Sequence, residues 1–167
     1  MMRRRFLSAF ALVALLSSPA LAGVKQGDRA AEFVQVVDGA GKAISLKRFK
    51  DQVVVVTFGA SWCEPCKKEL PAWEKLAQKY QKRGAKVVFI AVNIDTESAK
   101  AKKFMSTAGL HAVRAAFDRQ KSTVESYDPP KMPSTFVIKR GIVKHVHAGY
   151  QSGDENKLAS VIDRELK

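Results

Sequence analysis

The sequence reads Trp62-Cys63-Glu64-Pro65-Cys66 where an apolar run ends and a helical pattern begins, and it contains no other cysteine. A Cys-x-x-Cys pair at the start of a helix places two sulfurs on one face, one turn apart, where they can form a reversible disulfide. The positive end of the helix dipole lowers the pKa of such a thiol from about 8.5 to roughly 3.5–7.5. We therefore predict a redox-active dithiol in which Cys63 is the nucleophile and Cys66 its partner.

A structural bridge and a metal site are the alternative interpretations of this pair. A three-residue separation closes so short a loop that it removes little entropy from the unfolded chain. A structural zinc site uses about four ligands, and the sequence has no second Cys-x-x-Cys or zinc-finger Cys/His pair. His145 and His147 share one face of a predicted strand, but two histidines without a third ligand are more typical of surface or packing residues. We expect no bound metal and no cofactor other than the disulfide.

The N-terminal 22 residues have the three parts of an export signal. Arginines at positions 3–5 precede an apolar stretch over 6–16, and small residues lead to Ala20-Leu21-Ala22. We predict a signal peptide at 1–22 and one domain over 23–167, with the processed chain soluble in the periplasm. The start of the chain also resembles a twin-arginine signal, but its flanking residues depart from that pattern, so general secretion is favoured.

Composition limits the possible partners. The 167-residue chain has a formal net charge of +13, which favours acidic partners through long-range attraction without identifying one. No nucleic-acid-binding motif is present, so we do not expect nucleic-acid binding. A chain of this length can bury a core without cross-links, which leaves the disulfide available for chemistry. We expect a monomer.

The pattern of elements predicts an α/β protein. An apolar strand over 53–58, a helix over 65–83 and a second strand over 87–92 form a βαβ unit with parallel strands. Around this unit we expect an N-terminal hairpin over 33–37 and 42–45, helices over 97–108, 122–127 and 155–166, and strands over 115–117, 134–139 and 142–148. The dithiol then lies just past the C-terminal end of a central strand, where open α/β sheets place their sites.

The dithiol motif, Met132-Pro133-Ser134-Thr135-Phe136 and Gly149-Tyr150 together resemble a thioredoxin-fold protein. More narrowly, they resemble the exported TlpA/ResA/CcmG group of redoxin-related thiol-disulfide oxidoreductases, from roughly residue 25 to the C-terminus. The resemblance implies a thioredoxin fold: a central mixed sheet flanked by helices, with an N-terminal β-hairpin and an extra helix after the second central strand. It also implies that the Met132–Pro133 peptide bond is cis and that this loop lies against the disulfide.

Several side chains are candidates for roles beside the sulfurs. Glu69 follows Cys66 by three residues on the same side of the predicted helix and matches a glutamate near the dithiol in ResA-like proteins. It either tunes proton transfer at the thiols or is a carboxylate on the helix surface. Thr57 stands where ordinary thioredoxins keep a buried acid, so proton transfer through that acid cannot be assumed.

Other residues are candidates for contact with a client protein. Proline has no N–H, so the backbone edge at Met132, beside Pro133, can pair with an extended client segment. Trp62 either contacts clients or packs in the core, and we expect Glu64 and Pro65 to set the local environment and the redox poise.

The resemblance predicts a periplasmic oxidoreductase that reduces disulfides of client proteins, such as apocytochrome c or copper-site proteins. It implies a membrane electron donor of the DsbD/CcdA type. A Cu(I)-binding metallochaperone is an alternative, although Sco-type chaperones use a Cys-x-x-x-Cys spacing and a distant histidine. A thiol peroxidase is a lesser alternative, because peroxiredoxins carry Thr or Ser three residues before the reactive cysteine, where this chain has Ala60.

Overall fold

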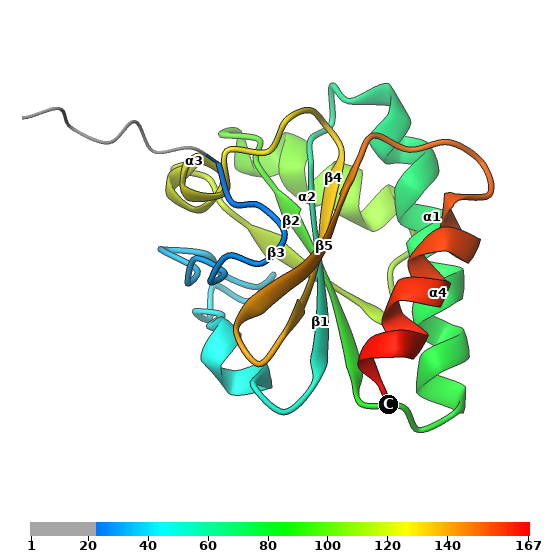
Figure 1. Cartoon of the computed structure of the whole chain (residues 1–167). Coiled ribbons are helices and arrows are strands. Elements are labelled where there is room, and N and C mark those ends of the chain that lie inside the picture. Colours follow the sequence, from blue (N-terminus) through cyan, green and yellow to red (C-terminus); the bar gives the residue numbers. More distant parts are fainter. Residues whose placement is uncertain (1–22) are drawn as a thin grey trace, which may run out of the picture.

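The computed structural model of the chain describes residues 23–167, so the expected signal peptide at 1–22 lies outside the described residues. The centre is a five-stranded mixed sheet with strand order β3-β2-β1-β4-β5 (Figure 1). Its strands are β1 (Val53–Gly59), β2 (Val87–Asn93), β3 (Val113–Phe117), β4 (Ser134–Lys139) and β5 (Ile142–Ala148). β1 pairs parallel with β2 and antiparallel with β4, so it is the middle strand. The predicted α/β class and thioredoxin fold are confirmed.

The α-helices lie within one or two residues of their predicted bounds. They are α1 (Glu64–Lys82), α2 (Ser98–Thr107), α3 (Ser122–Tyr127) and α4 (Asp154–Glu165). The chain also forms a 3-10 helix (Leu46–Phe49) that was not predicted. α2 is the extra helix expected after the second central strand. Within the described part of the chain, no helix combines the length and apolar character needed to cross a membrane.

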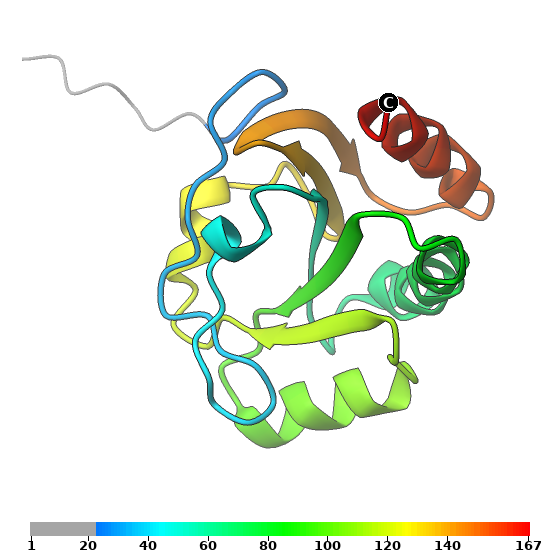
Figure 2. The ribbon, with the colours of Figure 1, turned by 90° about the horizontal axis from the view of Figure 1, so that it is seen from below.

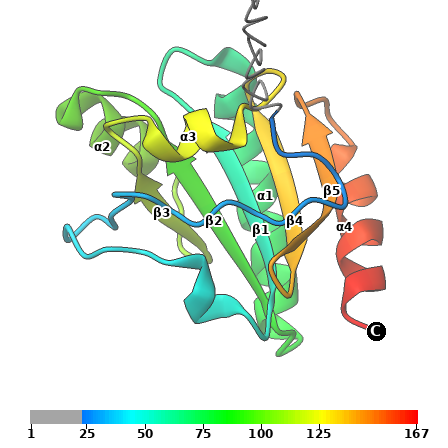
Figure 3. The same ribbon diagram turned by 60° about the vertical axis from the view of Figure 1, so that its left-hand side comes forward.

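The two faces of the sheet bury different sets of side chains. Val53 and Val55 face a core shared with α1, α2 and α4. Val54 and Val56 face the opposite core, which is covered by α3 and the N-terminal segment (Figures 2 and 3). Every residue of β1 is buried, and each fully buried valine contributes about 1.5–3 kcal/mol. The continuous apolar run is therefore explained by burial on both faces of a middle strand.

The predicted N-terminal hairpin forms only in part. A turn is present at 38–41, and Val37 pairs with Ala43. The pairing is a single bridge, because Gln35 has a φ of 57° and this left-handed backbone interrupts an extended strand. Val37 also pairs with Phe117, so the segment covers the β3 edge of the sheet instead of forming two regular strands.

Glu74 joins α1 to the start of β3. Its carboxylate accepts the backbone N–H groups of Ala112 and Val113 at 2.9–3.0 Å and the side-chain amide of Gln78 at 2.8 Å. Burial by itself raises the pKa of Glu74, but the N–H groups of Val113 and Ala112 outweigh it and hold that pKa below its ordinary value. The ionised carboxylate thus fixes α1, the helix that carries the dithiol, to the start of the edge strand β3.

We expect Glu74→Ala to lower the free energy of unfolding by about 1–3 kcal/mol, because it leaves buried N–H groups without an acceptor. Urea denaturation at pH 7 and at pH 4 measures the change. The lowered folded-state pKa of Glu74 stabilises the fold at pH values above the unfolded-state pKa, and this stability is lost as pH falls through the folded-state pKa. The decrease in unfolding free energy caused by Glu74→Ala should therefore be smaller at pH 4 than at pH 7. The exposed neighbour Lys75 provides the control variant Lys75→Ala, and an equal loss in both variants would contradict this role.

Candidate active site

The two cysteines form a disulfide at the N-terminus of α1. Their Cα atoms are 5.3 Å apart. Cys63 is the N-cap residue, and its sulfur accepts the backbone N–H of Cys66 at 3.3 Å. Cys63 is 5% exposed and Cys66 is fully buried. Cys63 is therefore the outer sulfur, placed where the helix N-terminus stabilises negative charge.

The loop that carries Cys63 is held by the end of β2. Asp95 accepts the backbone N–H of Ser61 at 2.9 Å and its hydroxyl at 3.0 Å. The backbone N–H of Ile94 donates to the carbonyl of Gly59 at 3.0 Å. Gly59 has no Cβ, and one built there would lie only 3.2 Å from the sulfur of Cys66. These contacts fix the disulfide against the end of the middle strand.

Three predicted contact residues surround the disulfide at the surface. Trp62 is 65% exposed, so core packing, one of its two interpretations, is wrong. Pro65 occupies the first turn of α1, where a missing backbone N–H costs no intrahelical hydrogen bond. Glu64 is exposed and accepts a hydrogen bond from Lys67 at 2.8 Å, which lowers the pKa of Glu64.

The loop before β4 lies at the same edge of the sheet. Its Met132–Pro133 peptide bond is cis. Ser134, the first residue of β4, pairs with Phe58 near the end of β1. Met132 packs against the core cluster that contains both cysteines. The structure therefore brings this loop and the disulfide together, although they are far apart in the sequence.

Glu69 lies inside the protein, only 1% exposed, so its interpretation as a surface carboxylate is wrong. Its two oxygens accept hydrogen bonds from the hydroxyls of Thr57 at 2.7 Å and Thr135 at 3.0 Å. These threonines are directly opposite each other on β1 and β4. They form a polar cradle on the face of the sheet that α1 covers.

Burial raises the pKa of Glu69 to about 8, and the hydrogen bonds from Thr57 and Thr135 lower it only in part. The carboxyl is therefore mostly protonated at neutral pH but titrates close to it. Glu69 and Cys66 line one cavity of about 10 Å³, which is near the smallest volume that holds a water molecule. The inner sulfur thus has a proton-carrying group beside it.

Three residues of this arrangement, Thr135, Trp73 and Asp95, were not among the site residues expected from the sequence. Thr135 receives a hydrogen bond from the indole of Trp73 at 3.1 Å as well as donating to Glu69, and Asp95 holds Ser61. A threonine within each of two apolar strands was the available signal for the cradle. No local pattern marks Asp95 as the partner of a loop residue 34 positions away.

The histidines on β5 have other neighbours. His147 hydrogen-bonds Asp154 at 3.0 Å, and the His145 and His147 rings lie 6.4 Å apart. Burial lowers the pKa of His145. Among residues 23–167 there is no group of three or more histidine, cysteine or acidic side chains that could hold a metal ion.

We expect Glu69→Gln to change how stability depends on pH. A carboxyl whose folded-state pKa is raised to about 8 binds its proton more tightly in the folded protein, so its ionisation destabilises the fold as pH rises from about 4.5 to 8. Urea denaturation of the oxidised protein measures this effect. Between pH 5 and pH 8.5 the free energy of unfolding of the wild type should fall by on the order of 3 kcal/mol more than that of Glu69→Gln. Parallel pH curves for the two proteins would contradict a buried, neutral Glu69.

Comparison with known proteins matches residues 25–162 to the Redoxin family. The thiol-disulfide oxidoreductase ResA of Bacillus anthracis is 33% identical over 130 residues, which cover 77% of this chain and 73% of the relative. The ResA of Bacillus subtilis is 31% identical over 115 residues, which cover 69% of this chain and 62% of the relative.

A solved structure shows the same architecture. A crystal structure from Chlorobium tepidum, described as a thiol:disulfide interchange protein DsbE, superposes with a TM-score of 0.78 and is 29% identical. The match covers 87% of this chain and the whole of the other. StoA from Bacillus subtilis, at 22% identity and a TM-score of 0.65, shares the fold.

Proposed function

The chain belongs to the Redoxin family and is a thiol-disulfide oxidoreductase of the ResA/DsbE type, and we propose that it reduces disulfides of exported client proteins. The observation that carries this proposal is the asymmetry of the dithiol. Cys63 caps the helix and keeps some exposure, whereas Cys66 is buried beside a carboxyl whose pKa is about 8. One sulfur is thus placed to attack a client and the other to resolve the product.

The reaction transfers two electrons from the dithiol to the client. The Cys63 thiolate attacks a client disulfide, forming a mixed disulfide and releasing one client thiolate. The Cys66 thiol then loses its proton to the ionised form of Glu69, and its thiolate attacks the sulfur of Cys63. The second client thiolate leaves, and the Cys63–Cys66 disulfide remains. Glu69 acts best near its own pKa, where both its protonated and ionised forms are populated.

The surroundings of Cys63 support docking of an extended client segment. The chain edge at Met132, beside the disulfide, offers backbone groups for pairing in the manner of an added strand. Pro133 has no N–H, so it does not donate a hydrogen bond to the carbonyl groups of the client segment. The exposed indole of Trp62, the residue before Cys63, adds an apolar contact for the client.

Export and electron supply complete the proposal. The signal-like residues 1–22 support a periplasmic location for the domain at 23–167. An oxidised Cys63–Cys66 bridge must be reduced again, and a membrane protein of the DsbD/CcdA type is the proposed donor. The proposed clients are apocytochrome c haem-attachment cysteines or the cysteines of copper sites.

We expect Cys66→Ser to trap clients as mixed disulfides on Cys63, because the resolving sulfur is missing, and Cys63→Ser to trap none. Non-reducing electrophoresis of periplasmic extracts measures both.

A redox potential near −270 mV against glutathione supports reduction, whereas one near −120 mV would reverse the proposed electron flow. Peroxide turnover that survives in Cys66→Ser would favour the thiol peroxidase, and tight stoichiometric Cu(I) binding with negligible disulfide exchange would favour the metallochaperone.

We expect Glu69→Gln to lower the pKa of the Cys66 thiol in the reduced protein, because the neutral amide removes a negative charge beside the thiolate. The thiol and the carboxyl titrate as a coupled pair in the wild type, so one of the two shared titration steps should disappear. Thiolate absorbance against pH measures the change. The exposed Glu125 on α3 supplies the control variant Glu125→Gln, and unchanged thiol titration in Glu69→Gln would remove Glu69 from the mechanism.

A further inference from the structure

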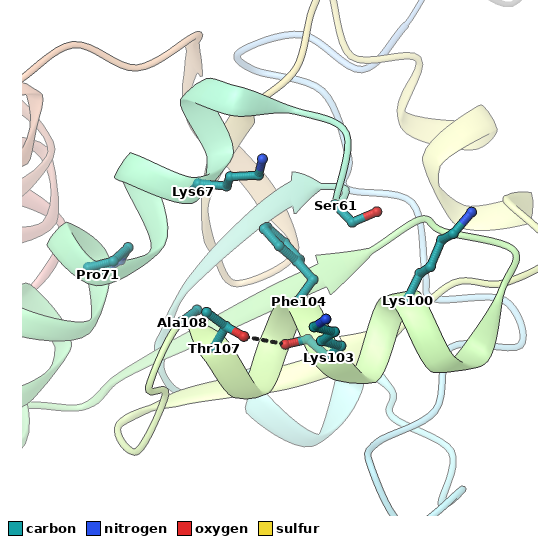
Figure 4. A pocket seen from close by; sticks show the side chains of 8 residues that line it. All are labelled: Ser61, Lys67, Pro71, Lys100, Lys103, Phe104, Thr107 and Ala108. Atoms are coloured by element: carbon teal, nitrogen blue, oxygen red, sulfur yellow. Dashed lines mark hydrogen bonds between the residues drawn. The ribbon is translucent and has the colours of Figure 1, made fainter.

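A groove of about 320 Å³ lies between α1 and α2 beside the disulfide loop (Figure 4). Ser61, two residues before Cys63, forms the end nearest the disulfide. Because Asp95 holds Ser61 through two hydrogen bonds, the groove and the reactive cysteine are parts of one fixed unit. The groove is therefore within reach of residues that flank the cysteine of a polypeptide joined to Cys63.

The interior of the groove is apolar. The ring of Phe104 points from α2 toward α1, between Ser61 and Lys67 (Figure 4). Pro71 on α1 and Ala108 at the end of α2 extend this apolar lining. The size and character of the space suit one apolar side chain, since burying such a side chain is favourable by about 1.5–3 kcal/mol.

The rim of the groove is cationic. Lys67 comes from α1, and Lys100 and Lys103 come from α2. Lys67 pairs with Glu64 and Lys100 with Glu97, but all four side chains are about half exposed or more, so these pairs are weak and can exchange partners. Lys103 has no ion-pair partner within residues 23–167. α2 itself contains three lysines and no carboxylate.

We propose that this groove selects clients whose reacting cysteine is flanked by one apolar side chain and one or two carboxylates. The apolar side chain enters the space over Phe104, and the carboxylates bind the lysine rim. This inference rests on the proposed function, because it names the client segment that the dithiol reduces. The charge of the rim favours such an acidic segment over a basic one, and so does the net charge, which is 13 − 3 = +10 without the three arginines of residues 1–22.

The test compares reduction of synthetic peptides that each contain one Cys-x-x-Cys disulfide. The three peptides differ in the residues that flank the disulfide, which are Asp and Leu, Lys and Leu, or Asp and Ser. The reduced wild-type protein should reduce the Asp/Leu peptide about two- to fivefold faster than either other peptide. Stopped-flow tryptophan fluorescence at low salt gives the rate constants, and the ratios between peptides cancel any general change in thiol reactivity.

A charge-reversed pair of variants tests the rim. Lys103→Glu should abolish the preference for the Asp/Leu peptide over the Lys/Leu peptide. Lys102→Glu is the matched control, because Lys102 is an exposed neighbour on the same helix but does not line the groove. Equal loss of preference in both variants would mean that overall charge, and not the groove, selects the client.

A second pair of variants tests the apolar space. Thr107→Trp fills the groove and should remove the preference for Leu over Ser in the client flank. Ser106→Trp is its control, because both hydroxyls donate to the carbonyl of Lys103 but only Thr107 lines the groove. Retention of the Leu preference in Thr107→Trp would overturn the proposal.

A small neutral disulfide distinguishes failure of the groove proposal from failure of the proposed reductase function. If the wild type reduces hydroxyethyl disulfide but treats all three peptides alike, the groove proposal fails and the proposed reductase function stands. If neither the small disulfide nor any peptide is reduced, the reductase function itself fails. Binding of the chain to anionic lipid vesicles through Lys103, without a peptide preference, would likewise overturn the choice of a client segment.

Discussion

The site depends on one constraint, the short connection between a strand buried on both faces and the helix that follows it. β1 ends at Gly59 and α1 begins at Glu64, so Cys63 must lie at the sheet edge and at the helix N-terminus at once. Burial fixes the strand, and the helix dipole acts on the first sulfur. The bond between Ser61 and Asp95 prevents this connection from rotating away from β2.

Beneath the disulfide, the protein keeps an acid in an apolar core. Removing Glu69 from water opposes its ionisation, and the two threonine hydroxyls offset only part of that penalty. The result is a carboxyl that changes charge near neutral pH, next to a sulfur whose reactivity depends on losing a proton. A carboxylate on the helix surface would stay ionised and screened by solvent, so burial is what makes this group useful.

In the proposed mode of client recognition, two parts of the surface near Cys63 have different tasks. The Met132 edge offers backbone pairing, which is indifferent to the client's side chains. The groove between α1 and α2 offers an apolar space with a cationic rim, which distinguishes side chains. Electrostatic attraction of this kind raises the rate of encounter more than the strength of the final complex, which suits the proposed release of a reduced client.

The sequence alone determined the dithiol, the α/β order and most element bounds, because helical periodicity, apolar runs and Cys-x-x-Cys spacing are local signals. The hairpin predicted at the N-terminus is longer than the single bridge that forms, since the left-handed backbone at Gln35 has no clear local signature. Only the tertiary structure decided that Glu69 is buried and Trp62 exposed. Both outcomes depend on what packs against α1 and its preceding loop: β4 brings Thr135 to Glu69 from 66 residues away, and no periodicity within the helix encodes such a partner.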